Sequence, residues 1–268
     1  MNLSISTGTF YAVPFWKMLE LIKKAGFEYI ELLLYWKGST WEMGQHLRDT
    51  PPAEALRMIE DSGLKISSIH DGGGLLEEGV TSIVSKSVYE YMVHGAGTIP
   101  CIVFHPPVKL SNDLNWWEAY QTIAARDLTY FKEKAIVCLE NLFPIGGESI
   151  PLLDPAEMLN FITANDICAT IDTTHCAQSG IHILQAAKKL GDRVRTVHLS
   201  DYAHPKSHVF VGEGTLDLKQ FMRALDQNKL HALTLECDVE YHEHDEPRTI
   251  ERLKQAYNYM KEITEEAL

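Results

Sequence analysis

Short apolar runs alternate with longer amphipathic runs eight times along this chain. The apolar runs have the length and content of buried strands, and we expect strands at 3–9, 29–35, 65–71, 101–106, 135–142, 167–172, 194–200 and 233–238. Between them, apolar residues recur at helical spacing, as Met18, Leu21 and Ile22 do. Eight such units without a break in composition predict one domain, residues 1–268, folded as an α/β protein of the (β/α)8 TIM barrel type.

Capping signals support the helices between these strands. Gly26 follows the first helical run, at the position where a left-handed residue commonly ends a helix. Asp154, Pro155 and Glu157 form an N-cap, a first-turn proline and a first-turn acid before the fifth helix. The last helix is expected to run from about 247 to 266 and to close the ring.

Six of the predicted strands end in a carboxylate or an imidazole. These endings are His70, His105, Glu140, Asp172, His198 and Glu236. A buried strand has no structural need for such a residue where its apolar run stops. Since the strands of a parallel barrel all end at one face, which is where barrel enzymes carry their active sites, we expect the site at the C-terminal ends of the strands.

The alternation of side chains along the strands also predicts a polar site at the C-terminal ends of the strands. If the endings point into the barrel, the residues two positions earlier do so as well. These inward partners are small: Ser68, Cys138, Thr170, Thr196 and Thr234. The residues directly before the endings then face the helices, and they are aliphatic: Ile69, Leu139, Ile171, Val197 and Leu235. Five strands in the same register predict a ring of polar endings above a narrow lumen.

A metal ion is the simplest reason to gather these groups. Glu140, Asp172, His198 and Glu236 would supply three carboxylates and one imidazole, a set that suits Zn²⁺, Mn²⁺, Mg²⁺ or Co²⁺ without choosing among them. Three anions held close together in a low-dielectric mouth require a cation. A second ion, held by His70, His105 and Glu140, stays open beside the alternative that both histidines bind substrate hydroxyls.

The net charge and the cysteine content limit the binding partners and the cellular location that we expect. Lys and Arg number 24 and Asp and Glu 37, so the formal net charge is 24 − 37 = −13. This charge disfavours nucleic acid and anionic membranes as partners. The five cysteines are odd in number and form no CxxC pair, which favours a reducing, cytoplasmic location. The sequence begins without a signal-peptide pattern and has no apolar stretch of membrane-spanning length, so we expect no membrane association.

Seven segments resemble the xylose-isomerase-like TIM barrel superfamily, which contains sugar isomerases and epimerases, inosose isomerases and dehydratases, and endonuclease-IV-type enzymes. The segments are GFEYIEL at 26–32, IVFHPP at 102–107, CLENL around Glu140, IDTTH at 171–175, VHLSD at 197–201, HVFVGEGTLDL at 208–218 and LTLECD around Glu236. They extend over nearly the whole chain. They are specific for the superfamily but do not name a substrate.

The resemblance implies roles for individual residues. In the isomerase and epimerase branch, the residues matching the four predicted ligands hold one divalent ion, which binds two oxygens of a ketose or cyclic ketone. The residues matching Glu140 and Glu236 also act as acid–base groups on opposite faces of the substrate. The residue matching His175 binds a substrate oxygen. Where the branch often has an arginine, this chain offers His204 or Lys206.

These observations predict a metal-dependent isomerase or epimerase of a small sugar or polyol-derived ketone. It would work by removing a proton next to a carbonyl and stabilising the resulting enediolate with the ion. His70, His105, His175, His204, His208 and Trp36 are the candidate substrate-binding residues. The expected partner is a small sugar or cyclic polyol, and the question of a homo-oligomer stays open.

Two alternatives belong to other functional classes. An endonuclease-IV-like phosphodiesterase acting on abasic DNA would use His70, His105, His175 and His208 in a three-zinc cluster. That branch also needs an aspartate where this chain has Lys206, and a cation there would repel the third metal. The second alternative is a barrel that binds a sugar without catalysis, and the complete set of four ligands disfavours it.

Overall fold

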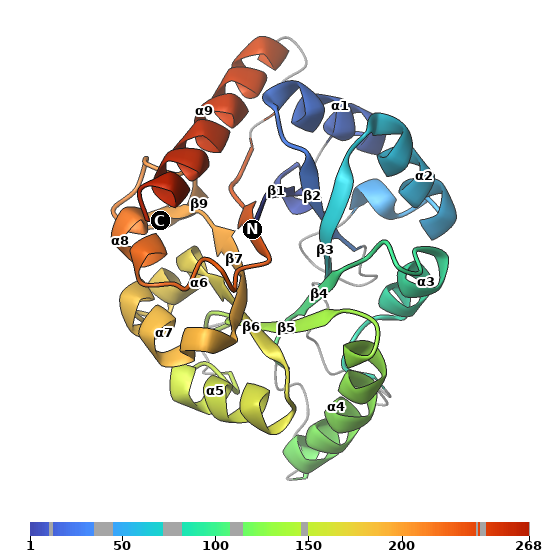
Figure 1. Ribbon diagram of the computed structural model, residues 1–268, viewed down its shortest axis with the longest axis vertical. Helices are drawn as coiled ribbons and strands as arrows, with labels where there is room; N and C mark the ends of the chain where they lie inside the picture. Colours follow the sequence, from blue (N-terminus) through green and yellow to red (C-terminus); the bar gives the residue numbers. More distant parts are fainter. Residues whose placement is uncertain are drawn as a thin grey trace.

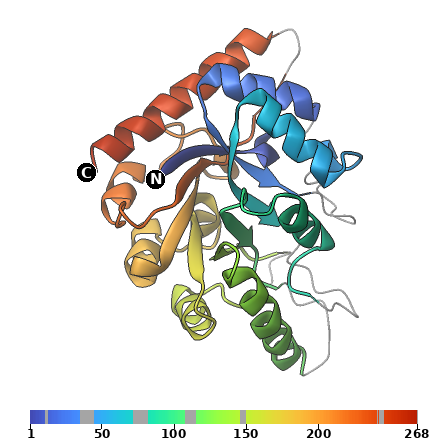
Figure 2. The ribbon, with the colours of Figure 1, turned by 45° about the vertical axis from the view of Figure 1, so that its right-hand side comes forward.

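Eight parallel strands close into a barrel surrounded by helices, as Figures 1 and 2 show from two directions. The computed structural model describes residues 1–10, 13–34, 45–71, 82–107, 115–145, 150–239, 241 and 245–267. Around the barrel the strands follow the order β1-β10-β7-β6-β5-β4-β3-β2, and neighbouring strands are parallel. The predicted (β/α)8 barrel is therefore confirmed.

The barrel strands are short and regularly spaced along the chain. They are β1 Asn2–Ser6, β2 Tyr29–Leu33, β3 Lys65–Asp71, β4 Cys101–Phe104, β5 Ile136–Glu140, β6 Cys168–Asp172, β7 Val194–Leu199 and β10 Ala232–Leu235. The helices are α1 Phe15–Ala25, α2 Pro52–Ser62, α3 Lys86–His94, α4 Trp116–Lys132, α5 Pro155–Ala164, α6 Thr173–Gln178, α7 Ile183–Leu190, α8 Leu218–Arg223 and α9 Glu246–Glu265. The described residues also include 3₁₀ turns at Thr7–Thr9, Gln45–Leu47 and Gly191–Arg193.

Several strands end earlier than their apolar runs predict. The run at 3–9 leaves the sheet at Ser6, whose side chain accepts a hydrogen bond from the Gly8 N–H at the start of a 3₁₀ turn. The runs at 101–106 and 233–238 end at Phe104 and Leu235. The residues that follow these strands are mostly polar, and several of them, among them Thr7, His105 and Cys237, are buried although they have left the strand. They form the short loops that position the site.

One element was not predicted. After β7 the chain forms an antiparallel hairpin from β8 Asp201–Ala203 and β9 Lys206–Val209. The hairpin lies between β7 and α8, within a segment that the apolar pattern assigned to a connection. Its strands are too short and too polar to give an alternating signal.

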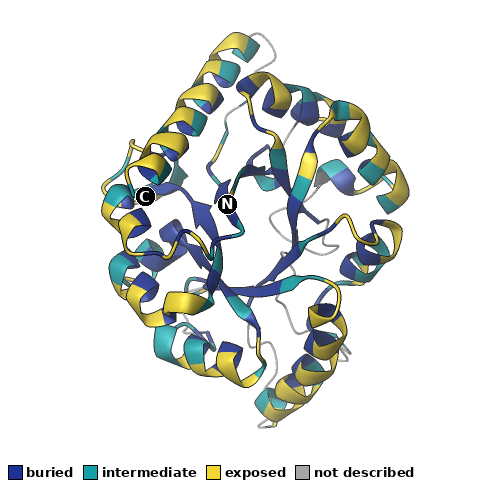
Figure 3. Cartoon of the chain, viewed as in Figure 1, coloured by how far each residue is buried: buried dark blue, intermediate teal, exposed yellow. Residues whose placement is uncertain are grey.

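The core has two separate parts. Ile69, Leu139 and Val197 belong to the large layer between the strands and the helices, as the alternation predicted. The lumen holds a second cluster, in which Cys101, Val103 and Cys138 are fully buried. Figure 3 shows buried strands at the centre and helices whose outward faces are exposed. The polar endings of the strands lie above this small apolar floor.

The predicted caps are present. Gly26 adopts a left-handed conformation, with φ of 99°, after the last residue of α1. The side chain of Asp154 accepts hydrogen bonds from Ala156 N at 2.7 Å and Glu157 N at 3.2 Å at the start of α5. Within the described residues, no helix combines the length and hydrophobicity that a membrane span requires.

Candidate metal centre

Three strands and one strand-end loop bring the four predicted metal ligands together. Glu140 and Asp172 are the last residues of β5 and β6, and His198 is the next-to-last residue of β7. Glu236 follows β10, but its N–H still donates to the Leu199 carbonyl at 3.0 Å, which holds it beside β7. The side chains of the first three are fully buried, and that of Glu236 is 17% exposed.

The atoms that face one another in this group lack hydrogen bonds. His198 Nδ1 lies 3.1 Å from Glu140 Oε2 and 2.7 Å from Glu236 Oε2. Nevertheless, His198 Nδ1, both Glu140 oxygens, Asp172 Oδ2 and Glu236 Oε2 are buried without a hydrogen-bond partner among the described residues. Each residue offers one ligand atom within 4.8 Å of the others. Buried polar atoms normally have partners, so this geometry fits a divalent cation.

A second group shares Glu140. His70 lies on β3, and its Nε2 is 3.2 Å from Glu140 Oε2. His105, one residue past β4, places Nε2 at 3.4 Å from the same oxygen and at 3.1 Å from His70 Nε2. The three residues offer ligand atoms within 4.8 Å of one another. The structure thus brings both histidines to the same mouth as the four predicted ligands.

A third group lies on the other side of the mouth. Asp172, His175 and His208 also offer ligand atoms within 4.8 Å of one another. Asp172 Oδ1 caps α6 by accepting a hydrogen bond from His175 N at 2.6 Å, which leaves Oδ2 free. His175 Nδ1 lies 3.0 Å from the Asn141 carbonyl and 3.1 Å from Glu140 Oε1. Lys206, at the start of β9, is exposed.

The pKa values of the buried groups in the mouth depend on the charges of their neighbours. Burial alone would raise the pKa of Glu140, but the neighbouring histidines, His198 first, hold it well below its usual range. Burial alone would lower the pKa of His70, but Glu140 and Glu31 raise it to about 10. In the same way, Asp172 and Glu140 raise the pKa of His175 to about 9 against its burial. Alternating carboxylates and imidazoles therefore stabilise one another's charged forms.

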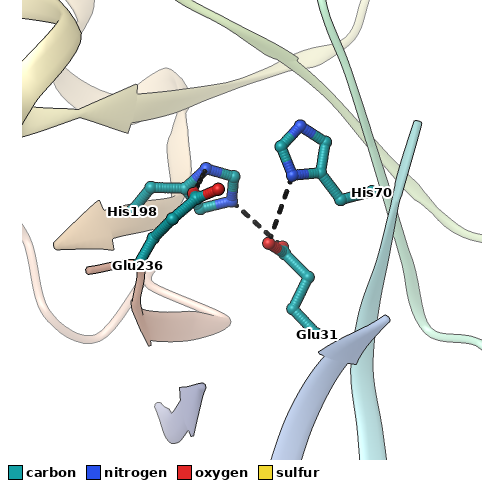
Figure 4. A group of neighbouring side chains, drawn as sticks. All are labelled: Glu31, His70, His198 and Glu236. Atoms are coloured by element: carbon teal, nitrogen blue, oxygen red, sulfur yellow. Dashed lines mark hydrogen bonds and ion pairs between the residues drawn. The ribbon is translucent and has the colours of Figure 1, made fainter. Parts of the chain in front are cut away.

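One buried acid of the mouth was not predicted from the sequence. Glu31, in the middle of β2, is fully buried and points into the barrel between the rings of His70 and His198 (Figure 4). It lies inside the segment GFEYIEL, but it precedes Leu32 and Leu33 and so is not a strand ending. The signal available in the sequence was a lone acid within an apolar run, a position that a buried charge occupies only when it is paired.

Two predicted substrate-binding residues are not placed at this cluster by the described part of the structure. His204 is exposed in the connection between β8 and β9, and its Nδ1 lies 3.1 Å from the hydroxyl of Tyr202. No contact between His204 and the buried cluster occurs among the described residues. Trp36 lies outside the residues that the structure describes. The roles of both residues stay predictions.

Solved structures with the same barrel include several sugar epimerases. An L-ribulose 3-epimerase superposes with a TM-score of 0.71 at 19% identity, covering 99% of this chain and 95% of the other. The D-allulose 3-epimerase of a Methylomonas species, solved with D-allulose, gives 0.72 at 16% identity, covering 98% and 96%. The IolI protein with a bound zinc atom gives 0.68 at 16% identity, covering 100% and 99%. At these identities the similarity establishes the fold.

The sequence itself gives the family. No curated protein sequence shows significant similarity to this chain. Residues 19–263, which include all four predicted metal ligands, match the family described as the xylose isomerase-like TIM barrel. The match extends over most of the 268 residues. This chain therefore belongs to the xylose isomerase-like TIM barrel family.

Proposed function

We propose that this protein is a divalent-metal-dependent isomerase or epimerase of a small sugar or polyol-derived ketone. The observation that carries the proposal is the convergence of Glu140, Asp172, His198 and Glu236, whose facing atoms lack hydrogen bonds to any described residue. Sugar epimerases and a zinc-binding protein among the structural neighbours support it. The family contains enzymes that act on such substrates, and the barrel mouth is where such activity would lie.

The four residues would hold one cation of the Zn²⁺, Mn²⁺, Mg²⁺ or Co²⁺ type. When bound, the cation would supply a positive charge for the oxygens next to the reacting carbon. A second ion would use His70, His105 and Glu140, which already lie within reach of one another. Because both groups share Glu140, loss of this residue would affect both.

Glu236 and Glu140 are the proposed proton-transfer groups. A side chain can remove a proton next to a carbonyl at neutral pH only if the developing negative charge is stabilised. Glu236 is the one of the two with an exposed fraction, 17%, so it is better placed to meet a substrate entering from the mouth. Glu140 is fully buried among four histidines and is better placed to hold the cation.

The histidines around the cation site would orient the substrate. His105 and His175 are 8% and 7% exposed, so each presents an edge to the mouth while its ring is held by neighbours. His208 is half-buried, and its Nδ1 lies 3.1 Å from the Glu236 carbonyl. Imidazole nitrogens at the rim suit hydroxyl groups of a sugar or cyclic polyol. His204 and Trp36 are proposed as outer contacts, and the cytoplasm as the location.

Proton abstraction can be tested before the substrate is known. The protein, reconstituted with Mn²⁺, Zn²⁺, Mg²⁺ or Co²⁺, would be incubated in D₂O with a panel of ketoses, inososes and hydroxyketones. Deuterium entering a carbon-bound position of one compound, lost in the chelator-treated sample, supports the proposal. Absence of exchange in every compound with every metal would refute proton abstraction and favour a hydrolytic or non-catalytic barrel.

A further inference from the structure

The buried carboxylate of Glu31 has no part in the four-ligand set, yet it contacts the ring of one of its members. We propose that Glu31 is a positioning residue that fixes His198 with Nδ1 facing the cation site. This role rests on the proposed metal site. It concerns which nitrogen of the ring is free to bind, a property that no ligand set by itself defines.

The contact spans the interior of the barrel. Glu31 stands on β2 and His198 on β7, 167 positions later in the sequence, and Glu31 Oε2 lies 3.0 Å from His198 Nε2 (Figure 4). The same oxygen accepts a hydrogen bond from Ser68 Oγ at 2.7 Å. Glu31 and Ser68 are register partners on adjacent parallel strands, so both side chains point into the lumen. The hydroxyl of Ser68 thus holds the carboxylate of Glu31 in place.

This contact determines which nitrogen of the His198 ring carries the proton when the ring is neutral. An ionised carboxylate only accepts hydrogen bonds, so Nε2 must donate to Glu31. In a neutral imidazole the other nitrogen, Nδ1, then carries the free lone pair. Nδ1 is the nitrogen that lies 3.1 Å from Glu140 Oε2 and 2.7 Å from Glu236 Oε2, and no described residue forms a hydrogen bond with it. The ring is therefore oriented with its binding nitrogen toward the predicted ligands.

The second oxygen of Glu31 lies near another histidine. Glu31 Oε1 is 3.4 Å from His70 Nδ1, a contact in which neither atom forms a hydrogen bond among the described residues. The opposite nitrogen of that ring, Nε2, lies 3.2 Å from Glu140 Oε2. Both rings therefore lie between Glu31 and Glu140, and of the two it is the His198 ring that is hydrogen-bonded to Glu31.

Glu31 is also close enough to serve as a ligand itself, together with His70, His198 and Glu236. The hydrogen bonds of Oε2 argue against binding through that oxygen. It already accepts from Ser68 and from His198, whereas Oε1, like the facing atoms of the four predicted ligands, has no hydrogen-bond partner among the described residues. A cation bound through Oε2 would replace the proton on His198 Nε2, so ligation through this oxygen and positioning of the ring predict different metal-bound nitrogens.

The decisive experiment uses the zinc-loaded wild-type protein with ¹⁵N-labelled histidine. Long-range ¹H–¹⁵N correlations distinguish a metal-bound nitrogen from a protonated one. The proposal predicts that His198 binds zinc through Nδ1 and keeps its proton on Nε2. Zinc on Nε2 would overturn it, and so would a protein that binds no zinc. This measurement needs no variant and does not depend on turnover.

Glu31→Gln supplies the second test, with Glu213→Gln, an exposed glutamate paired with Arg252, as matched control. The glutamine amide can donate to Nε2 and favour the wrong tautomer. Zinc affinity, measured against a competing chelator, should fall about 10- to 100-fold in Glu31→Gln and stay unchanged in the control. If Glu31→Gln fails to fold, Ser68→Ala, which removes only the supporting hydroxyl, should weaken zinc binding in the same direction.

A purely structural role would show a different pattern. The metal-free variant would then lose stability in urea while its zinc affinity stayed at the wild-type value, and this would overturn the proposal. Failure of the proposed reaction is separable. A protein that binds zinc through Nδ1 with dependence on Glu31, but exchanges no deuterium into any ketone, would refute the isomerase and leave the role of Glu31 standing.

Discussion

Glu140 Oε2 lies 3.1 Å from His198 Nδ1, yet neither atom forms a hydrogen bond within the part of the chain that the structure describes. The two side chains come from β5 and β7, with β6 between them, and both are fully buried. Two polar atoms this close are thus buried without a hydrogen-bond partner. A cation bound by both atoms would satisfy them, and this relationship is the basis of the proposed metal site.

Replacing each glutamate by glutamine should separate cation binding from proton transfer. Glutamine keeps a carbonyl oxygen, but it cannot accept a proton in the working range of pH. We expect Glu236→Gln to retain most of its bound metal while turnover falls by about 10²–10⁴. Glu140→Gln should lose much of its metal. Metal content and turnover of both variants would be measured on the compound found by deuterium exchange.

A matched control for these variants is Glu246→Gln, at the start of α9, where the carboxylate pairs with Lys17 at 2.6 Å outside the barrel. It should keep both metal and turnover. If Glu236→Gln kept full turnover, Glu236 would not be the proton acceptor, and Glu140 would take its place in the mechanism.

Cation binding should release protons. Neighbouring carboxylates raise the pKa of His70 to about 10 and that of His198 well above its ordinary value, against the effect of burial. At pH 7 these rings carry protons that a cation must displace from the binding nitrogens. Calorimetric titration with Zn²⁺ in buffers of different ionisation enthalpy should show release of at least about one proton per ion.

The same raised pKa values determine how the affinity for the cation depends on pH. Because protonated rings compete with the cation, apparent affinity should rise as the pH rises from 6 to 9, the side on which His175, with a pKa of about 9, loses its proton. Proton release should then diminish above pH 10. A binding enthalpy independent of the buffer would contradict this picture of the site.

Asn141 should matter for the stability of the mouth. Its amide bridges to the backbone of Asp172: Asn141 Oδ1 accepts from Asp172 N at 2.8 Å, and Nδ2 donates to the Asp172 carbonyl at 3.1 Å. Asn141→Ala would leave both groups buried and unpaired. The free energy of unfolding in urea should fall by about 1–3 kcal/mol. Asn228→Ala, an exposed control, should change it by less than about 0.5 kcal/mol.

Abasic duplex DNA should not be cleaved above background. Several groups of donors lie in the mouth, but the endonuclease-IV branch needs an aspartate where this chain has Lys206, and the net charge is −13. Nicking would be assayed with each divalent metal. Strong metal-dependent nicking that disappears in His175→Ala would favour the phosphodiesterase over the isomerase.

The barrel and its polar mouth could be predicted from the sequence because both depend on simple alternation. Glu140, Asp172 and His198 close apolar runs, and a strand that ends at the mouth of a parallel barrel delivers its last side chains there. The limits of the strands were harder to predict. His105 and Glu236 directly follow the last strand residues, Phe104 and Leu235, and the residue types give no sign that strand pairing stops there.

Glu31 escaped prediction for a related reason. It lies inside a strand, and its partners on β3 and β7 become neighbours only when the barrel closes. A register shift between β2 and β3 at Ile30 and Glu31 also determines which residue of β3 lies beside it, and no local pattern reveals that shift. The hairpin of β8 and β9 was missed because its strands are three and four residues long.

The position of the cation tests the central claim most directly. Crystals of the protein grown with Zn²⁺ or Mn²⁺ would be measured at the absorption edge of the metal. The account predicts an anomalous peak about 2.0–2.3 Å from donor atoms of Glu140, Asp172, His198 and Glu236. A peak absent from this group, or a structure in which these four side chains are scattered or face the helices, would contradict it.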